Sequence, residues 1–146
     1  MAEAGGRQEL PIENYHIPLI FYAPRHIAPA RIETIASQMD VAPTLLGLLG
    51  FSYRSRFFGH DILRDGPGHP RALMANYQTV GYYEDGLVVE LRPNSRVRVV
   101  DAQSGREVPD SDQTRQLVDE AVSYYQLASE AYRQGNLKLG HTAPGH

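Results

Sequence analysis

The first seventy residues contain two strongly apolar segments separated by polar loops. Residues 17–23 are almost continuously apolar and end at Pro24, a pattern typical of a strand covered on both faces of a layered sheet. A leucine-rich segment at residues 41–49 follows Asp40, a residue suited to a helix N-cap, and stops before Gly50. We therefore predict a buried strand at 17–23 and a short apolar helix at 41–49.

After residue 70 the apolar positions alternate in short segments. Turn-forming pairs separate these segments at Asp85-Gly86, Pro93-Asn94 and Ser104-Gly105. This pattern predicts an antiparallel meander with one covered face. The predicted strands are residues 71–77, 79–83, 87–91, 96–101 and 106–108.

A long helical pattern closes the chain at residues 112–135. Asp110 and Gln113 have the spacing of a capping box at its start. Apolar side chains then recur at helical spacing, which predicts that one face of the helix packs on the meander. The helix face comprises Leu117, Ala121, Tyr124, Ala128 and Tyr132, and we expect Leu73, Val88 and Val99 to meet it.

Composition excludes several classes of function. The net charge of −3 gives no reason to expect a nucleic-acid partner. The chain has no cysteine, which rules out disulfides and thiolate metal sites. No apolar stretch approaches the roughly 20 residues of a membrane helix, so we expect a soluble chain.

The chemistry-bearing residues alone do not define an active site. His60-Asp61 is the most suggestive pair, but an adjacent pair lacks metal-ligand spacing, and a loop histidine beside a turn residue is the simpler interpretation. Thr44 stands at a helix start, where its hydroxyl most simply completes the first turn. The tyrosines are better explained by packing than by ligand stacking. The six histidines are His16, His26, His60, His69, His141 and His146.

Three segments in fixed order resemble a known family. Residues 15–24 (YHIPLIFYAP), 37–50 (SQMDVAPTLLGLLG) and 57–63 (FFGHDIL) are similar to the C-terminal part of sulfatase-like enzymes of the alkaline phosphatase superfamily. Residues 74–83 and 121–136 resemble most closely the bacterial lipoteichoic acid synthase-like, or phosphoglycerol transferase, branch.

The resemblance implies a fold. It is an α/β chain in which residues 10–70 form a partial alkaline-phosphatase-like sheet segment. Residues 71–137 then form a small antiparallel meander packed on a C-terminal helix, and residues 1–9 and 138–146 are tails.

The resemblance also implies a parent enzyme. Such a parent is a metal-dependent hydrolase or transferase that acts on sulfate or phosphate esters with manganese, magnesium, calcium or zinc. It is anchored in the bacterial inner membrane with its catalytic domain outside the cytoplasm. Its nucleophile and metal ligands lie upstream of the matching region, and the Asp-His-Gly motif expected just before Gly6 is missing.

We therefore expect a fragment that is inactive in isolation. It is assigned no catalytic residue, no metal ligand and no cofactor of its own. His16 and Arg7 are the residues offered as contributors to a substrate pocket. The expected partners are the missing N-terminal catalytic part and further copies of the fragment, with no nucleic acid. The alternative is a stand-alone, non-catalytic scaffold or binding module, and the reading frame upstream of Met1 distinguishes the two.

Overall fold

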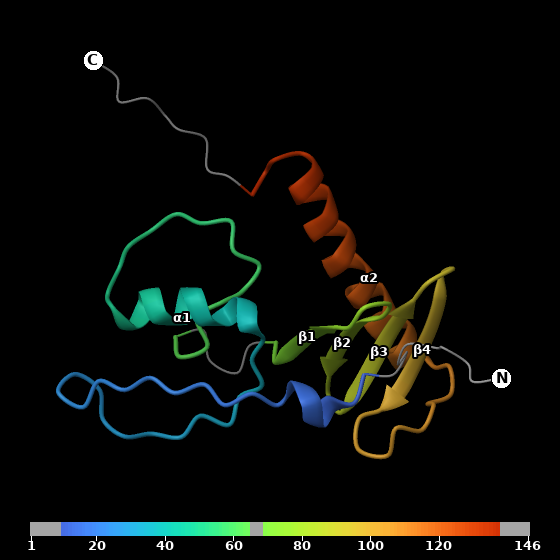
Figure 1. Ribbon diagram of the computed structural model, residues 1–146, viewed down its shortest axis with the longest axis horizontal. Helices are drawn as coiled ribbons and strands as arrows, with labels where there is room; N and C mark the ends of the chain where they lie inside the picture. Colours follow the sequence, from blue (N-terminus) through green and yellow to red (C-terminus); the bar gives the residue numbers. More distant parts are fainter. Residues whose placement is uncertain (1–9, 65–68, 138–146) are drawn as a thin grey trace.

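The computed structural model describes residues 10–64 and 69–137. A four-stranded antiparallel sheet carries a long C-terminal helix, and a loop-rich region with one short helix lies beside it (Figure 1). The α/β class with a meander and a C-terminal helix is confirmed. The elements are η1 (Ile12–Tyr15), η2 (Gln38–Asp40), α1 (Val41–Leu48), β1 (Arg71–Ala75), β2 (Val80–Glu84), β3 (Leu87–Arg92), β4 (Arg96–Asp101) and α2 (Asp112–Arg133).

The sheet follows the predicted meander. Its spatial order is β1-β2-β3-β4, so each strand pairs with its neighbour in sequence. Asp85 and Gly86 have φ values of 47° and 78°, the left-handed conformation that a tight hairpin turn requires. The fifth predicted strand, at residues 106–108, is wrong because only one bridge, between Val100 and Glu107, forms there.

Both faces of the sheet are covered, whereas the sequence predicted one. Tyr82, Val89 and Val99 are cross-strand neighbours and pack with Leu117 and Ala121 of α2. Since successive side chains in a strand point to opposite faces, the residue next to Val89 faces away from the helix. The expectation that Val88 meets α2 is therefore wrong.

The second face is covered by the start of the described chain. Met74, Val88 and Val100 form a separate core with Ile12 and Tyr15 of η1. The Tyr15 hydroxyl donates to the Ala75 carbonyl at 3.0 Å, sixty residues along the chain. The N-terminal segment is thus part of the subdomain that the sheet builds.

The cap of α2 differs from the prediction by one residue. Ser111 has an extended backbone and accepts a hydrogen bond from the Thr114 amide at 3.2 Å, while the Thr114 hydroxyl accepts from the Ser111 amide at 2.8 Å. Ser111 and Thr114 therefore form the capping box, and Asp110 instead bonds the Arg115 guanidinium. The helix runs beyond the sheet at its C-terminal end (Figure 1), where Tyr132 is exposed.

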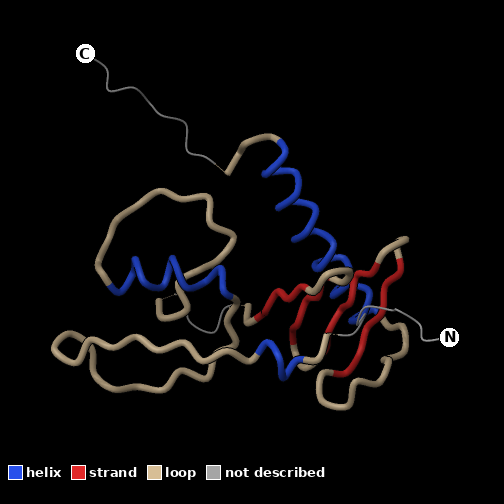
Figure 2. Tube along the Cα trace, in the orientation of Figure 1, coloured by secondary structure: helices blue, strands red, loops and turns tan. Residues whose placement is uncertain are grey.

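The predicted strand at 17–23 is absent. This segment is an extended loop (Figure 2), and no described strand pairs with it. Ile20 is 80% exposed and Tyr22 is 86% exposed. A strand requires hydrogen bonds to a neighbouring strand, and apolar sequence alone cannot supply them.

Helix α1 forms at Val41–Leu48, one residue shorter than predicted, and Asp40 occupies its N-cap position, although the Asp40 side chain makes no capping hydrogen bond to α1. Asp40 has helical backbone angles and ends η2, where its carboxylate accepts a hydrogen bond from the Ser37 amide at 2.7 Å. The two helices therefore run together as one element. None of the helices in residues 10–64 and 69–137 is long and apolar enough to cross a bilayer.

The core beneath α2 provides a stability test. Leu117 is 6% exposed against Tyr82, Val89 and Val99, so Leu117→Ala should lower the free energy of unfolding by about 2–5 kcal/mol. Leu127→Ala on the same helix removes a side chain that is 60% exposed and should cost less than about 0.5 kcal/mol. Urea unfolding followed by circular dichroism measures both, and equal losses would contradict this packing.

Candidate functional site

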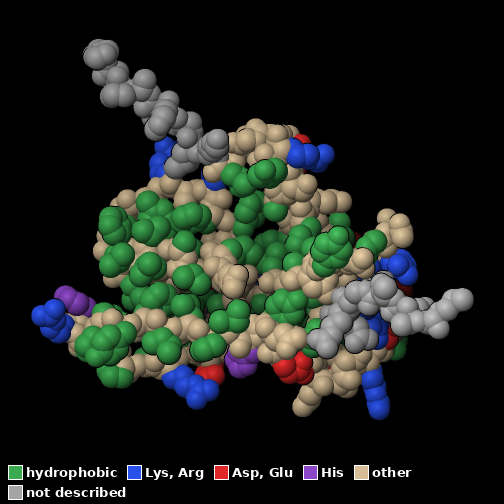
Figure 3. All heavy atoms as spheres, in the orientation of Figure 1, with side chains coloured by type: hydrophobic (Ala, Val, Ile, Leu, Met, Phe, Trp, Pro, Cys, Tyr) green, Lys and Arg blue, Asp and Glu red, His purple; other side chains and the backbone are tan. Residues whose placement is uncertain are grey.

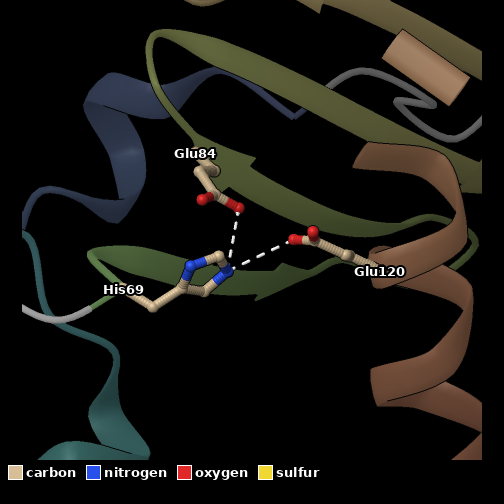
Figure 4. Close-up of side chains that lie close together, drawn as sticks. All are labelled: His69, Glu84 and Glu120. Carbon is tan, nitrogen blue, oxygen red and sulfur yellow. Dashed lines mark hydrogen bonds and ion pairs between the residues drawn. The ribbon is translucent and has the colours of Figure 1, made fainter. Parts of the chain in front are cut away.

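Four polar side chains converge where α2 crosses β2. His69 comes from the residues before β1, and Tyr82 and Glu84 come from β2. Glu120 comes from α2, and its side chain and that of Glu84 point toward His69 (Figure 4). The His69 Nε2 atom lies 3.2 Å from Glu84 Oε2 and 3.2 Å from Glu120 Oε2. The Tyr82 hydroxyl lies 3.1 Å from His69 Nε2 and 2.8 Å from Glu84 Oε2.

The strand and the helix fix these side chains in different ways. Tyr82 and Glu84 are two residues apart on β2, so both point toward α2. Tyr82 is fully buried and holds the Glu84 carboxylate with its hydroxyl. Gln116 lies one turn before Glu120 and donates to Glu120 Oε1 at 3.1 Å, which leaves Oε2 turned toward His69. His69 is the exposed member of the cluster.

The two carboxylates have different proton affinities. Burial raises the pKa of Glu84 above its usual range, and the Tyr82 hydrogen bond and the charge of His69 offset this only in part. Burial also acts to raise the pKa of Glu120, but the hydrogen bond from Gln116 and the charge of His69 outweigh it, so the pKa is lowered. Burial raises the pKa of Tyr82, which keeps this phenol protonated. The cluster can therefore bind a cation or share a proton.

An open pocket of about 540 Å³ borders this cluster. His69 and Glu120 line one part of it, and the rest is mainly apolar. The other lining residues are Phe57, Phe58, Gln116, Asp119, Ser123, Tyr124 and Leu127. Solvent and small ligands can thus reach the His69 imidazole.

Sequence reasoning did not bring these residues together. His69 appeared only as one of six histidines, and Glu84 and Glu120 were not singled out. They lie 15 and 51 residues beyond His69, so no spacing rule connects them. Only the register of β2 against the start of β1 and the crossing of α2 place them side by side.

A second cluster is centred on two buried charged side chains and joins the loop-rich region to the sheet. Arg71 Nη2 at the start of β1 lies 3.5 Å from Asp40 Oδ1, and both side chains are at most 2% exposed. The guanidinium also donates to the Phe58 carbonyl at 3.2 Å and to the Tyr124 hydroxyl at 2.7 Å. The Arg71 guanidinium thus contacts η2, the 57–63 loop and α2.

His60 belongs to this cluster rather than to a pair with Asp61. Its amide donates to Asp40 Oδ1 at 3.0 Å, and its Nδ1 lies 3.3 Å from Arg71 Nη1. The same Nδ1 lies 3.3 Å from Asp40 Oδ1, so the imidazole contacts both members of the ion pair. His60 is thus a loop residue as expected, but its side chain is partly buried, 24% exposed, rather than on the open surface. Asp61 accepts a hydrogen bond from the Leu63 amide at 3.0 Å, as a turn residue does.

Thr44 has the structural role expected of it. Its hydroxyl donates to the Asp40 carbonyl at 2.6 Å and accepts from the Ile62 amide at 3.2 Å. Gly59 lets the same loop approach closely, because a Cβ there would collide with the Met39 carbonyl. These contacts hold residues 57–63 against η2 and α1.

Exposed apolar side chains gather on the loop-rich region (Figure 3). Twelve of the seventeen exposed large hydrophobic side chains among the described residues fall between positions 17 and 63. We call this set the apolar surface. It comprises Ile17, Leu19, Ile20, Tyr22, Ile32, Leu45, Leu49, Phe51, Tyr53, Phe57, Phe58 and Leu63.

The two residues predicted for a substrate pocket do not join either cluster. His16 follows η1, is exposed, and makes no hydrogen bond or ion pair to another described residue. It stands at the start of the exposed 17–23 segment. Arg7 lies outside the described residues. Both assignments stay predictions.

Two comparisons with known proteins show what this chain is similar to. Residues 2–51 match the family model described as Sulfatase. A crystal structure of a protein in the alkaline phosphatase superfamily from Vibrio parahaemolyticus superposes with a TM-score of 0.77 at 27% sequence identity, over 95% of this chain. Both findings support the alkaline phosphatase superfamily for this chain. The match covers 34% of the Vibrio parahaemolyticus protein, so this chain spans about a third of that protein's length.

The buried ion pair gives a second prediction. Arg71→Met leaves the Asp40 carboxylate buried without its cation, which should lower the free energy of unfolding by about 3–5 kcal/mol. Arg96→Met, at an exposed position on β4, should change it by less than about 0.5 kcal/mol. Asp40→Asn combined with Arg71→Met should cost less than the sum of the two single changes, because the residues interact directly. Urea unfolding of the unaltered chain and of the four variants (Arg71→Met, Arg96→Met, Asp40→Asn and the double variant) measures these losses, and additive losses would contradict the coupling.

Proposed function

We propose that this chain is the C-terminal part of a sulfatase-like, metal-dependent enzyme and that the apolar surface packs against the catalytic part of that enzyme. The observation that carries the proposal is the exposure of Ile17, Ile20 and Tyr22 within the stretch that matches the Sulfatase model. A run of apolar side chains on both sides of the backbone suits a strand inside a sheet.

The size of the apolar surface supports this role. Burying each large apolar side chain contributes roughly 1.5–3 kcal/mol, so leaving a dozen of them in water is unfavourable. Contiguous apolar patches of this kind mark interaction surfaces. The Ile62 amide bonds the Thr44 hydroxyl, and Gly59 packs against the Met39 carbonyl. These contacts hold the 57–63 loop against η2 and α1, while the apolar side chains of both segments stay exposed.

In this proposal the parent cleaves a sulfate or phosphate ester, or transfers phosphoglycerol onto a glycan as lipoteichoic acid synthase-like enzymes do. A divalent metal ion in the catalytic part would supply Lewis-acid chemistry. The parent's localisation, in the bacterial inner membrane with the catalytic domain outside the cytoplasm, belongs to the same proposal. This chain would complete the sheet, and His16 and Arg7 would border the substrate pocket from the start of the added strand.

The isolated chain should show no turnover, because no nucleophile or metal ligand of that chemistry is assigned to it. The assay uses a chromogenic sulfate ester and a chromogenic phosphodiester, each with manganese, magnesium, calcium or zinc. A longer product of the same reading frame that includes an upstream Thr or Cys nucleophile and an Asp-His-Gly motif should be active with metal. Turnover by the isolated chain that survives further purification would overturn the proposal. A frame that begins at Met1 would favour a stand-alone binding module.

The apolar surface should also make the isolated chain self-associate at micromolar concentration, because exposed apolar segments recruit other chains. Ile20→Lys places a charge in the middle of this surface and should shift the chain toward monomer. Tyr77→Lys changes an equally exposed side chain, 96% exposed, outside the surface and should leave association unchanged. Sedimentation velocity measures all three proteins. A folded monomer at these concentrations would mean that the apolar surface is stable in water without another chain packed on it, and would contradict this prediction.

A further inference from the structure

We propose that His69, Glu84 and Glu120 form a zinc-binding site that links the start of the sheet to β2 and α2. The site is independent of the proposed parent activity. It uses one imidazole nitrogen and two carboxylate oxygens, which are donor types that bind zinc in proteins. The Tyr82 hydroxyl lies 3.1 Å, 2.8 Å and 3.3 Å from the His69, Glu84 and Glu120 ligand atoms. The three ligand atoms lie within 4.8 Å of one another.

Two of the three ligand spacings are close to those around a tetrahedral ion. Zinc ligands at about 2.0–2.2 Å and at tetrahedral angles are separated from one another by about 3.4 Å. His69 Nε2 lies 3.2 Å from each of the two Oε2 atoms. The site therefore needs only a small expansion to receive the ion, and His69, on the residues leading into β1, is exposed enough to make it.

Neighbouring groups orient these ligands as outer partners do in metal sites. The Tyr82 hydroxyl donates to Glu84 Oε2 at 2.8 Å from a fully buried position. Gln116 donates to the second oxygen of Glu120 at 3.1 Å, which fixes the rotation of that carboxylate. Such partners position ligating atoms and strengthen metal binding. The open pocket beside His69 and Glu120 supplies a path of entry and room for a bound water.

Charge also favours a cation here. Two carboxylates and a neutral imidazole balance a divalent ion, and Asp119 lies at the rim of the same pocket. No lysine or arginine is among the described residues that line this pocket. Imidazole favours zinc and similar transition metals, whereas magnesium and calcium prefer oxygen ligands alone. The site should therefore discriminate between these two groups of ions.

The test measures metal binding by the full chain after it has been stripped with a chelator. Isothermal titration with zinc chloride should give one saturable site, and magnesium or calcium should not compete at 100-fold excess. Because the ion bridges three segments, saturating zinc should raise the melting temperature by about 5–10 °C. Cobalt should give the intense visible absorption of a tetrahedral complex.

Variants separate this site from other histidines. His69→Ala should weaken zinc binding at least 10-fold and remove both the thermal shift and the cobalt spectrum, and Glu120→Gln should do the same. His16→Ala and a double His141→Ala, His146→Ala variant should bind zinc as the unaltered chain does. The proposal is overturned if no saturable zinc binding occurs below about 100 μM, or if binding persists unchanged in His69→Ala while the tail variant loses it.

Discussion

The buried ion pair between Arg71 and Asp40 is the contact on which the rest of the arrangement depends. A guanidinium that is 2% exposed cannot remain charged and unsatisfied, so every segment around it must supply an acceptor. Asp40, the Phe58 carbonyl and the Tyr124 hydroxyl do so, and they belong to η2, the 57–63 loop and α2. The start of β1 thereby sets the position of the loop-rich region relative to the sheet. Removing one member of such a pair leaves an uncompensated buried charge, so an arrangement that separates the two charges inside the protein is strongly unfavourable.

The sequence was most informative where structure is local. Asp85-Gly86 fixed a hairpin because a tight turn needs left-handed residues, and the alternation around it gave β2 and β3 within a residue or two. The periodicity of α2 identified Leu117 and Ala121 as core residues. Resemblance of three ordered motifs pointed to the alkaline phosphatase superfamily, which the structural match supports. In each case the prediction rested on short segments whose pattern can be recognised without knowing what the rest of the chain does.

The errors arose where a residue's environment comes from distant parts of the chain. Residues 17–23 have the composition of a buried strand, but a strand exists only beside a partner, and none of the described strands lies there. Val88 was assigned to the wrong face because a meander has two faces and the N-terminal segment covers the second. The environment of His60 is set by Asp40 and Arg71, which lie 20 and 11 residues away in sequence. The environment of His69 is set by Glu84 and Glu120, which lie 15 and 51 residues away.

The cover that η1 places on the second face of the sheet has a consequence for how the chain folds as it is made. The Leu10 amide meets the Glu90 carboxylate at 3.4 Å, and Leu10 occupies the space above Gly81, where any Cβ would collide with it. The residues that close this core therefore leave the ribosome some 60 to 90 residues before the strand residues that they contact. The hairpins between β1 and β4 can form from neighbouring residues at once, whereas the first segment must wait and then return across the finished sheet. This segment is thus synthesised before the strands on which it docks and is among the last to pack, so its apolar side chains stay accessible until the sheet has formed.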